Sequence, residues 1–229
     1  MKRFLAVLLA ALLGVMLAGC GSTPSQSKLS TSALLKKARA YVTAQKDVGL
    51  SGRIDQGGAE TSLDLKYAGD DSYGTIKLSG ATITLESVGG KTYFKPSKEF
   101  WTQQLSKDQA ATVTGLIGDR WIIANPGNAN FAQLIALAKR SFLTEQVLTP
   151  EGTITKGKVT TISGTKAIPL KLKEGAIYLA DEDARPLQVK GSSTSGSGTA
   201  TFSYDKVTIP AAPTGKDVVD LTKLLSSTK

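Results

Sequence analysis

The segment TSLDLKYAGDDSYGTIKLSGATITLESVGGKTYFK, residues 61–95, decides the fold of this chain. Apolar and polar residues alternate in runs such as LDLKY and ITLE, and short glycine-containing stretches separate these runs. Alternation with a period of two puts apolar side chains on one face of a β-strand, and turn residues at this spacing join successive strands into hairpins. We therefore predict a meander of four or five antiparallel strands between Gly49 and Lys95.

Helical patterns lie on both sides of this meander. Ser30–Lys46 repeats apolar residues on one helical face, Ser106–Gly118 begins with a capping box and ends at glycine, and Phe131–Arg140 has a third apolar face. Strand patterns return from Thr153. The apolar residues of Val218–Leu225 predict a short terminal helix.

The order of these elements predicts the fold class. No break in composition divides residues 30–229, so we expect a single domain there. Strands, then helices, then strands again are typical of an α+β fold. We predict a large, mostly antiparallel sheet with helices on one face.

The N-terminal residues predict a lipoprotein signal peptide over 1–19. Lys2 and Arg3 precede the 14-residue apolar run Phe4–Leu17, which is shorter than the about 20 residues of a membrane-spanning helix. The run leads into Leu17, Ala18, Gly19 and Cys20, a sequence that resembles the lipobox of bacterial lipoproteins, and Cys20 is the only cysteine. We expect cleavage after Gly19, acylation of Cys20 by diacylglycerol and fatty acids such as palmitate, and anchorage on the extracytoplasmic face of the cell membrane. Residues 20–29 would carry the lipid and form a flexible tether.

Composition excludes several classes of function. The chain has no histidine and one cysteine, which rules out a Ser-His-Asp triad, His-ligated zinc and an internal disulfide. Its formal net charge is +9, but the lysines are spread through the strands without an arginine cluster or an aromatic platform. We expect no nucleic-acid partner. Ordinary solubilising lysines explain the charge, and anionic headgroups or acidic wall polymers are the alternative partners.

Motifs of catalysis or metal binding are weak. Gly152–Val159 matches most of a P-loop but lacks the Ser or Thr that binds magnesium, and the three Ser-x-x-Lys matches lack the companion motifs of penicillin-binding proteins. Asp181–Asp183 is interpreted as a solvated turn rather than a calcium site. We therefore expect no catalytic residue, no metal and no cofactor. An enzyme that uses carboxylates or a Ser-Lys pair remains a second alternative.

Several short segments resemble the LppX/LprA/LprF/LprG lipoproteins of actinobacteria, which are relatives in fold of the LolA and LolB lipoprotein carriers. These segments are Lys91–Lys95, Phe100–Trp101, Asp119–Ile122, Ala176–Ala180, Arg185–Val189 and Gly198–Tyr204. The resemblance implies a strongly curved antiparallel half-barrel whose mouth is covered by helices. It also implies an apolar cavity for the acyl chains of lipids or glycolipids and a role as a carrier or chaperone of envelope lipids.

Apolar residues on the predicted core faces are the candidate lining of such a cavity. They are Leu65, Tyr67, Ile83, Leu85, Leu116, Ile117, Phe131, Leu134 and Leu172. The same side chains could simply fill a core, because an open cavity and a filled core use the same residue types. The first alternative to a lipid carrier is therefore an accessory lipoprotein with a filled core that docks on a transporter, a sensor or a wall polymer.

Overall fold

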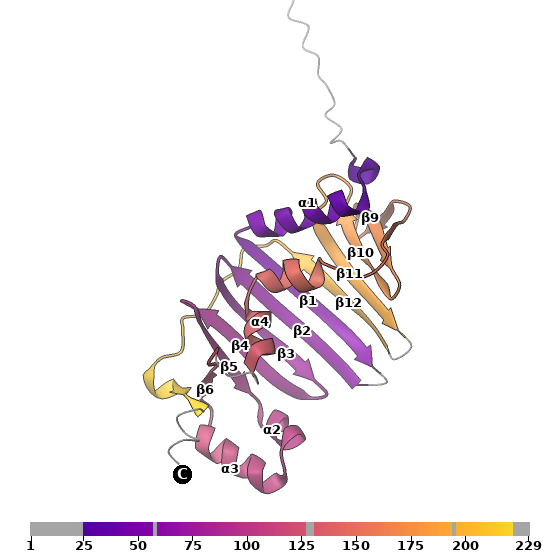
Figure 1. Ribbon diagram of the computed structural model, residues 1–229. Coiled ribbons are helices and arrows are strands. Elements are labelled where there is room, and N and C mark those ends of the chain that lie inside the picture. Colours follow the sequence, from indigo (N-terminus) through magenta and orange to yellow (C-terminus); the bar gives the residue numbers. More distant parts are fainter. Residues whose placement is uncertain (1–24, 57–58, 127–130, 194–195, 222–229) are drawn as a thin grey trace, which may run out of the picture.

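The structure is a computed structural model that describes residues 25–56, 59–126, 131–193 and 196–221 (Figure 1). Its strands are β1 Asp47–Gln56, β2 Ala59–Ala68, β3 Asp71–Leu78, β4 Ala81–Val88, β5 Lys91–Pro96, β6 Trp121–Ile123, β7 Thr155–Lys156, β8 Thr160–Ile162, β9 Thr165–Leu172, β10 Gly175–Ala180, β11 Pro186–Ser193, β12 Gly196–Ser203 and β13 Val218–Val219. Its helices are η1 Gln26–Lys28, α1 Thr31–Ala44, α2 Lys98–Gln104, α3 Lys107–Ile117, α4 Ala132–Ala138, η3 Leu143–Val147 and η4 Gly215–Asp217.

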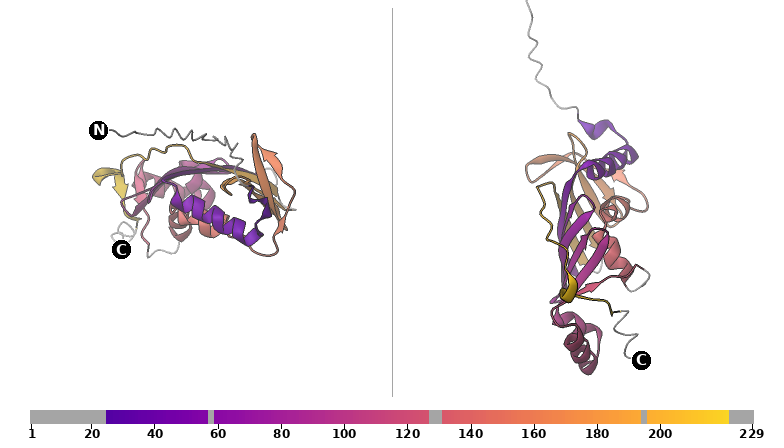
Figure 2. Two further views of the ribbon diagram at one scale, coloured as in Figure 1. Left: turned by 90° about the horizontal axis from the view of Figure 1, so that it is seen from above. Right: turned by 90° about the vertical axis from the view of Figure 1, so that its left-hand side faces the viewer.

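One continuous sheet organises the described residues and confirms the predicted α+β fold class. The predicted meander is present as β1 to β5, each antiparallel to the next. A second antiparallel run, β9 to β12, joins it because β12 pairs with β1, with Leu50 opposite Phe202. The order is β13-β6-β5-β4-β3-β2-β1-β12-β11-β10-β9-β7, and β8 also pairs with β9. The sheet is strongly curved, as Figure 2 shows from above.

Helices α1 and α4 lie on the concave face of this sheet (Figures 1 and 2). Ser30 caps α1 by accepting a hydrogen bond from the Ala33 amide at 3.2 Å, and Leu34, Leu35, Ala38 and Val42 are buried along one stripe. These side chains join a core cluster with Leu50 and other apolar residues of the strands. The predicted face of α1 is therefore the face that packs on the sheet.

Helices α2 and α3 form a hairpin at one end of the sheet instead of covering its concave face (Figures 1 and 2). The predicted capping box is present, because the Gln109 amide donates to Ser106 Oγ and the Ser106 amide donates to Gln109 Oε1. Gly118 ends α3 with φ +60°, a conformation that favours glycine. None of the helices in the described ranges is long and apolar enough to cross a bilayer.

The predicted terminal helix is wrong at its start, although Leu221 is helical. Val218 and Val219 form β13, which pairs in parallel with Trp121 and Ile122 of β6. Two adjacent β-branched residues suit a strand, and the edge of β6 offers unpaired backbone groups. The chain reaches this edge by crossing the convex face of the sheet, opposite α1 and α4 (Figure 2). Leu224 and Leu225 lie outside the described residues.

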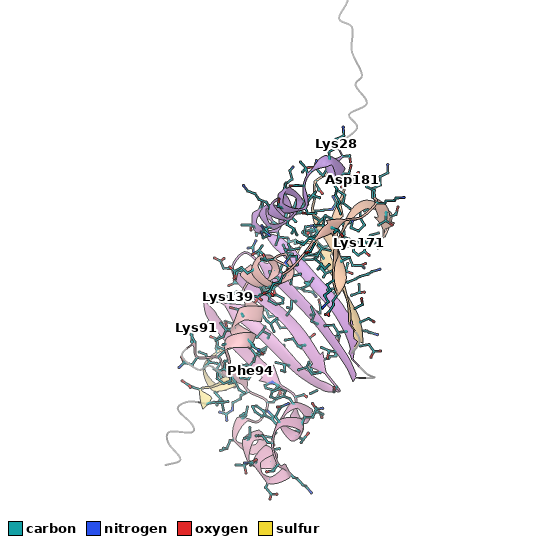
Figure 3. The ribbon with its side chains drawn as sticks, turned by 45° about the vertical axis from the view of Figure 1, so that its right-hand side comes forward. Lys28, Lys91, Phe94, Lys139, Lys171 and Asp181 are labelled. Carbon is teal, nitrogen blue, oxygen red and sulfur yellow. The ribbon has the colours of Figure 1, made fainter. Side chains whose placement is uncertain are left out.

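The described part of the predicted tether is bound to the domain. The Gln26 amide donates to the Asp181 carbonyl at 2.7 Å, while Ser25 Oγ and the Ser27 amide donate to Asp181 Oδ1 at 2.8 and 3.1 Å. Lys156 Nζ donates to the Leu29 carbonyl at 2.9 Å. Residues 25–29 therefore leave the domain at the Asp181 end of β10, where Figure 3 labels Lys28 and Asp181 together. Cys20 and the rest of the predicted lipobox lie outside the described residues.

Candidate functional site

A hollow opens on the concave face where β1, β2, β11 and β12 extend beyond α1 and α4 (Figure 1). We call it the distal hollow, and its volume is about 350 Å³. Its lining consists of Gly52, Arg53, Ile54, Leu63, Glu174, Val189, Gly191, Ser192 and the segment 196–200. This volume lies at the lower end of the range of about 300–1,000 Å³ found for ligand pockets.

Glycines line the distal hollow for two different reasons, because some allow close packing of neighbouring strands and one leaves space open. A Cβ at Gly52 would meet the Ala200 Cβ at 2.8 Å, and one at Gly198 would meet the Ile54 Cγ1 at 2.8 Å. These positions therefore require glycine, and a strand glycine commonly marks a bend or a close approach. Gly191 differs, because a Cβ there would have only the Glu174 carbonyl oxygen nearby, at 4.0 Å. The hollow can thus accept a side chain, or a ligand, above Gly191.

The remaining walls of the distal hollow are apolar and continuous with the core. Leu63, Val189 and Ala200 are half-buried and pack against the core cluster, while Ile54 is 37% exposed. Glu174 and Arg53 are the charged residues of the lining, and the Arg53 side chain points to the convex face because its neighbours Gly52 and Ile54 face the hollow. An apolar surface with the charged residue Glu174 at its margin suits a ligand that combines an apolar chain with a polar end.

A second hollow, of about 660 Å³, lies between α4 and the edge formed by β5 and β6. Its charged lining residues are Asp70, Lys91, Lys139, Arg140 and Asp220. Figure 3 labels Lys91 and Lys139 on this side of the molecule. Because its lining holds both acidic and basic residues, this hollow is more polar than the distal hollow and suits a charged or hydroxylated group rather than an alkyl chain.

Three side chains attach the C-terminal end of α4 to the sheet between these two hollows. Tyr67 Oη donates to the Leu137 carbonyl at 2.8 Å, and Ser72 Oγ donates to the Ala138 carbonyl at 2.7 Å. Arg140 Nε donates to the Gly69 carbonyl at 3.1 Å. The last carbonyls of a helix have no partner within the helix, and Tyr67 and Ser72 satisfy two of them, whereas Arg140 binds the turn between β2 and β3. Burial raises the pKa of the Tyr67 hydroxyl, which therefore stays protonated and remains a donor.

The nine residues predicted to line a cavity occupy three kinds of environment. Leu65, Tyr67, Ile83, Leu85 and Ile117 are buried in the core cluster, and Phe131, Leu134 and Leu172 are half-buried against it. The prediction that Leu116 lines a cavity is wrong, because this residue is 50% exposed on α3, away from the concave face. Phe94 of β5, labelled in Figure 3, packs against Phe131, the N-cap residue of α4, with ring centroids 4.9 Å apart.

None of these nine residues lines the distal hollow, and contact of any of them with lipid stays a prediction. Five residues of the hollow were not predicted from the sequence: Gly52, Ile54, Leu63, Val189 and Ala200. Leu63 carried a usable signal, since it shares the alternation of Leu65 and Tyr67 and so faces the same side. The glycines carried none, because a strand glycine does not reveal which side of a sheet is left open.

The acidic segment 181–183 is engaged in contacts within the protein. Asp181 binds residues 25–27, and Arg185 forms ion pairs with Glu182 and, at 2.9 Å, with Asp183. In the described ranges, no three or more His, Cys, Asp or Glu side chains are grouped so that they could hold a metal ion. The interpretation of this segment as a turn agrees with β10 ending at Ala180 and β11 beginning at Pro186.

Comparisons with known proteins find distant structural likeness. No protein-family model matches the chain, and no curated protein sequence matches it. The structure of LprF from Mycobacterium bovis is 12% identical, with 78% of this chain and 95% of that chain covered and a TM-score of 0.49. The Mycobacterium tuberculosis lipoprotein LppX is 13% identical, with 79% of this chain and 100% of that chain covered and a TM-score of 0.43. The structure of MucB from Pseudomonas aeruginosa in complex with MucA is 12% identical, with 79% of this chain and 58% of that chain covered and a TM-score of 0.39. LprF and LppX belong to the lipoproteins that the sequence resembles.

Proposed function

We propose that this chain is a membrane-anchored lipoprotein that binds the acyl chain of a lipid or glycolipid at the distal hollow and carries it within the cell envelope. The observation that carries this proposal is the hollow itself, an uncovered, largely apolar part of the concave face that continues the core. Burial of each methylene group of a ligand there would stabilise the complex by about 0.8 kcal/mol.

The lipobox supports the extracytoplasmic location of this activity. Acylation of Cys20 would hold the domain at the outer face of the membrane, where two acyl chains anchor stably. We propose no catalytic residue and no cofactor, so the chain would act by binding and release. The walls of the distal hollow are formed by strands, which makes the site rigid and leaves exchange to the open side.

The proposal differs from the sequence-based expectation in the position of the ligand. The region beneath α1 and α4 is filled by core side chains such as Leu65 and Leu85, which are 2% and 1% exposed. A ligand that entered this region would have to displace α4, which Tyr67 and Ser72 hold. The distal hollow needs no such displacement.

A filling variant tests this function. Gly191→Leu places a side chain in the distal hollow without a backbone clash, since the nearest atom to its Cβ is 4.0 Å away. Displacing about two methylene groups of a ligand, at about 0.8 kcal/mol each, weakens binding about tenfold. The measurement is titration of the chain from Gly21 onward with a fluorescent C16 fatty acid, together with native mass spectrometry of co-purified lipid.

Thr201→Leu is the matched control. Thr201 is exposed on β12 and points to the convex face, because its neighbours Ala200 and Phe202 belong to or pack against the core. This variant adds a similar apolar side chain to the sheet and should bind the fatty acid like the wild type. Equal affinities of the wild type and Gly191→Leu, or a wild type that carries no lipid and binds no fatty acid, would refute the proposal.

The filled space beneath the helices favours a second candidate function. An accessory lipoprotein with a filled core would dock on another envelope protein, such as a transporter, without carrying lipid. The fatty-acid titration separates the two functions: a chain that binds no lipid, but that is retained by a partner in crosslinking from intact cells, would be the accessory protein.

A further inference from the structure

Four cations form a row that crosses the convex face of the sheet from strand to strand. We call it the cation row: Lys171 of β9, Lys190 of β11, Arg53 of β1 and Lys77 of β3. The strand register sets the alignment. Lys171 lies opposite Ala176 of β10, which lies opposite Lys190, and Lys190 lies opposite Thr199 of β12. Thr199 lies opposite Arg53, which lies opposite Ser62 of β2, and Ser62 lies opposite Lys77.

The row alternates a cation with a small, uncharged residue. Ala176, Thr199 and Ser62 occupy the intervening strands. Strands are spaced by about 4.8 Å, so successive cations stand about 10 Å apart and the whole row spans about 29 Å. All four cations are exposed, whereas their chain neighbours Leu170, Val189 and Ile76 face the core side. The row therefore lies opposite α1, α4 and the distal hollow.

A groove of about 1,110 Å³ follows the part of this row that holds three of its four cations. It is lined by Lys171, Lys190 and Arg53 from the row and by residues of β8, β10 and β12. Thr160, Thr161 and Thr199 add hydroxyl groups, and Lys173 adds a further cation. Lys190 Nζ stands 5.5 Å from the centre of the Tyr178 ring, a cation–π distance that supports the lysine side chain over the groove floor.

Carboxylates flank the row without interrupting it. Asp55 lines the groove two residues from Arg53, and Asp64 of β2 stands in the next row, 3.6 Å from Lys66 Nζ. Within the row itself the charge has one sign. Spacing of about 10 Å is close to the screening length of about 8 Å at physiological ionic strength, so the cations repel each other only weakly. A ligand with negative charges at similar intervals would meet several of them at once.

We propose that the convex face is a docking surface for a linear polyanion that lies along the cation row, perpendicular to the strands. Charge complementarity and the groove select this occupant. A flat anionic membrane is disfavoured, because residues 25–29 leave the domain at the Asp181 end of β10, and the sheet face extends away from that end (Figure 3). In the proposed location the occupant is an acidic polymer of the cell wall or surface. This proposal does not depend on what the distal hollow binds.

The test compares two double variants that remove the same charge. Lys171→Gln with Lys190→Gln removes two cations of the row and groove, while Lys36→Gln with Lys37→Gln removes two exposed lysines of α1. The full chain in neutral detergent is titrated with long-chain inorganic polyphosphate and, separately, with poly-glutamate, which distinguishes phosphate from carboxylate recognition. Two lost surface ion pairs predict about tenfold weaker binding by the row variant and less than twofold weaker binding by the α1 variant.

Two further measurements test the role of the fourth cation and the alternative of a membrane contact. Lys77→Gln removes one cation at the far end of the row, outside the groove, and should weaken binding of the same polymer about threefold. Equal losses in the row and α1 double variants would overturn the proposal, since binding would then follow net charge alone. It would also be overturned if the row variant lost affinity for vesicles containing phosphatidylglycerol but kept its affinity for both polymers, because the surface would then be a membrane contact.

Discussion

Replacement of Tyr67 by phenylalanine tests how α4 is held on the concave face. The hydroxyl of Tyr67 is the donor to the Leu137 carbonyl at 2.8 Å, and the side chain is only 1% exposed. On the adjacent strand Ser72, directly opposite Tyr67, is the donor to the next carbonyl, that of Ala138. The two residues therefore form one attachment for the C-terminal end of α4.

The expected cost follows from the burial of this attachment. A net hydrogen bond contributes about 0.5–1.5 kcal/mol, and a buried carbonyl left without its donor costs about 1–3 kcal/mol. We therefore expect Tyr67→Phe to lower the free energy of unfolding by about 1.5 kcal/mol, and Ser72→Ala by a similar amount. For a domain of this size, this corresponds to a fall in Tm of about 3–6 °C for each variant.

Equilibrium unfolding in urea measures both variants and their combination. Loss of both donors lets the end of α4 separate from the sheet, so its two carbonyls regain water together. We add the losses in free energy of unfolding of the two single variants. The loss in the double variant should be smaller than this sum by at least about 0.5 kcal/mol. Tyr73→Phe, on the opposite face of β3, is the control and should change stability by less than about 0.5 kcal/mol. A Tyr67→Phe variant as stable as this control, or strict additivity, would refute a shared attachment.

Two further predictions concern Glu86 and the N-terminal segment. Glu86 is buried between Tyr73 and Tyr93, and burial raises its pKa, so the folded protein keeps the proton to higher pH than the unfolded chain. Stability must then fall as pH rises above the unfolded pKa of about 4.3. In thermal melts at pH 7, Glu86→Gln should therefore have a higher Tm than the wild type. A difference in Tm between the two proteins that does not narrow towards pH 4 would contradict this. Asp181→Ala removes the side-chain acceptor of the Ser25 hydroxyl and the Ser27 amide. Hydrogen exchange at the Ser27 amide should become about tenfold faster, while the Tm changes little. Unchanged exchange would show that other contacts hold the segment.

Local patterns predicted the elements that depend on neighbours in the chain. The alternation in residues 61–95 predicted β2 to β5, and the apolar stripe after Ser30 predicted α1. The capping box at Ser106 and the glycine stop at Gly118 were also right, because each is completed within one or two turns of helix. In each case the residues that decide the structure lie within about ten positions of one another.

The candidate site was much less predictable, because it depends on which strands become neighbours. The distal hollow needs Gly52 of β1 beside Ala200 of β12, two residues that the sequence separates widely. The predicted lining residues in the strands face the correct side of the sheet, but they are buried in the core cluster or packed against it. Amphipathic patterns give the face of a strand and carry no information on which part of that face a helix will cover.

The sequence by itself determined the class of the fold, the direction in which most strands and helices face, and the expectation of a lipid anchor at Cys20. Only the tertiary structure decided the pairing of β1 with β12, the parallel strand β13 and the alignment of the cation row. It also decided the binding of Ser25 to Asp181, which stand 156 positions apart. The physical reason is range: periodicity and caps arise from contacts within one element, whereas strand register and covered surfaces arise from packing between elements that are distant in the chain.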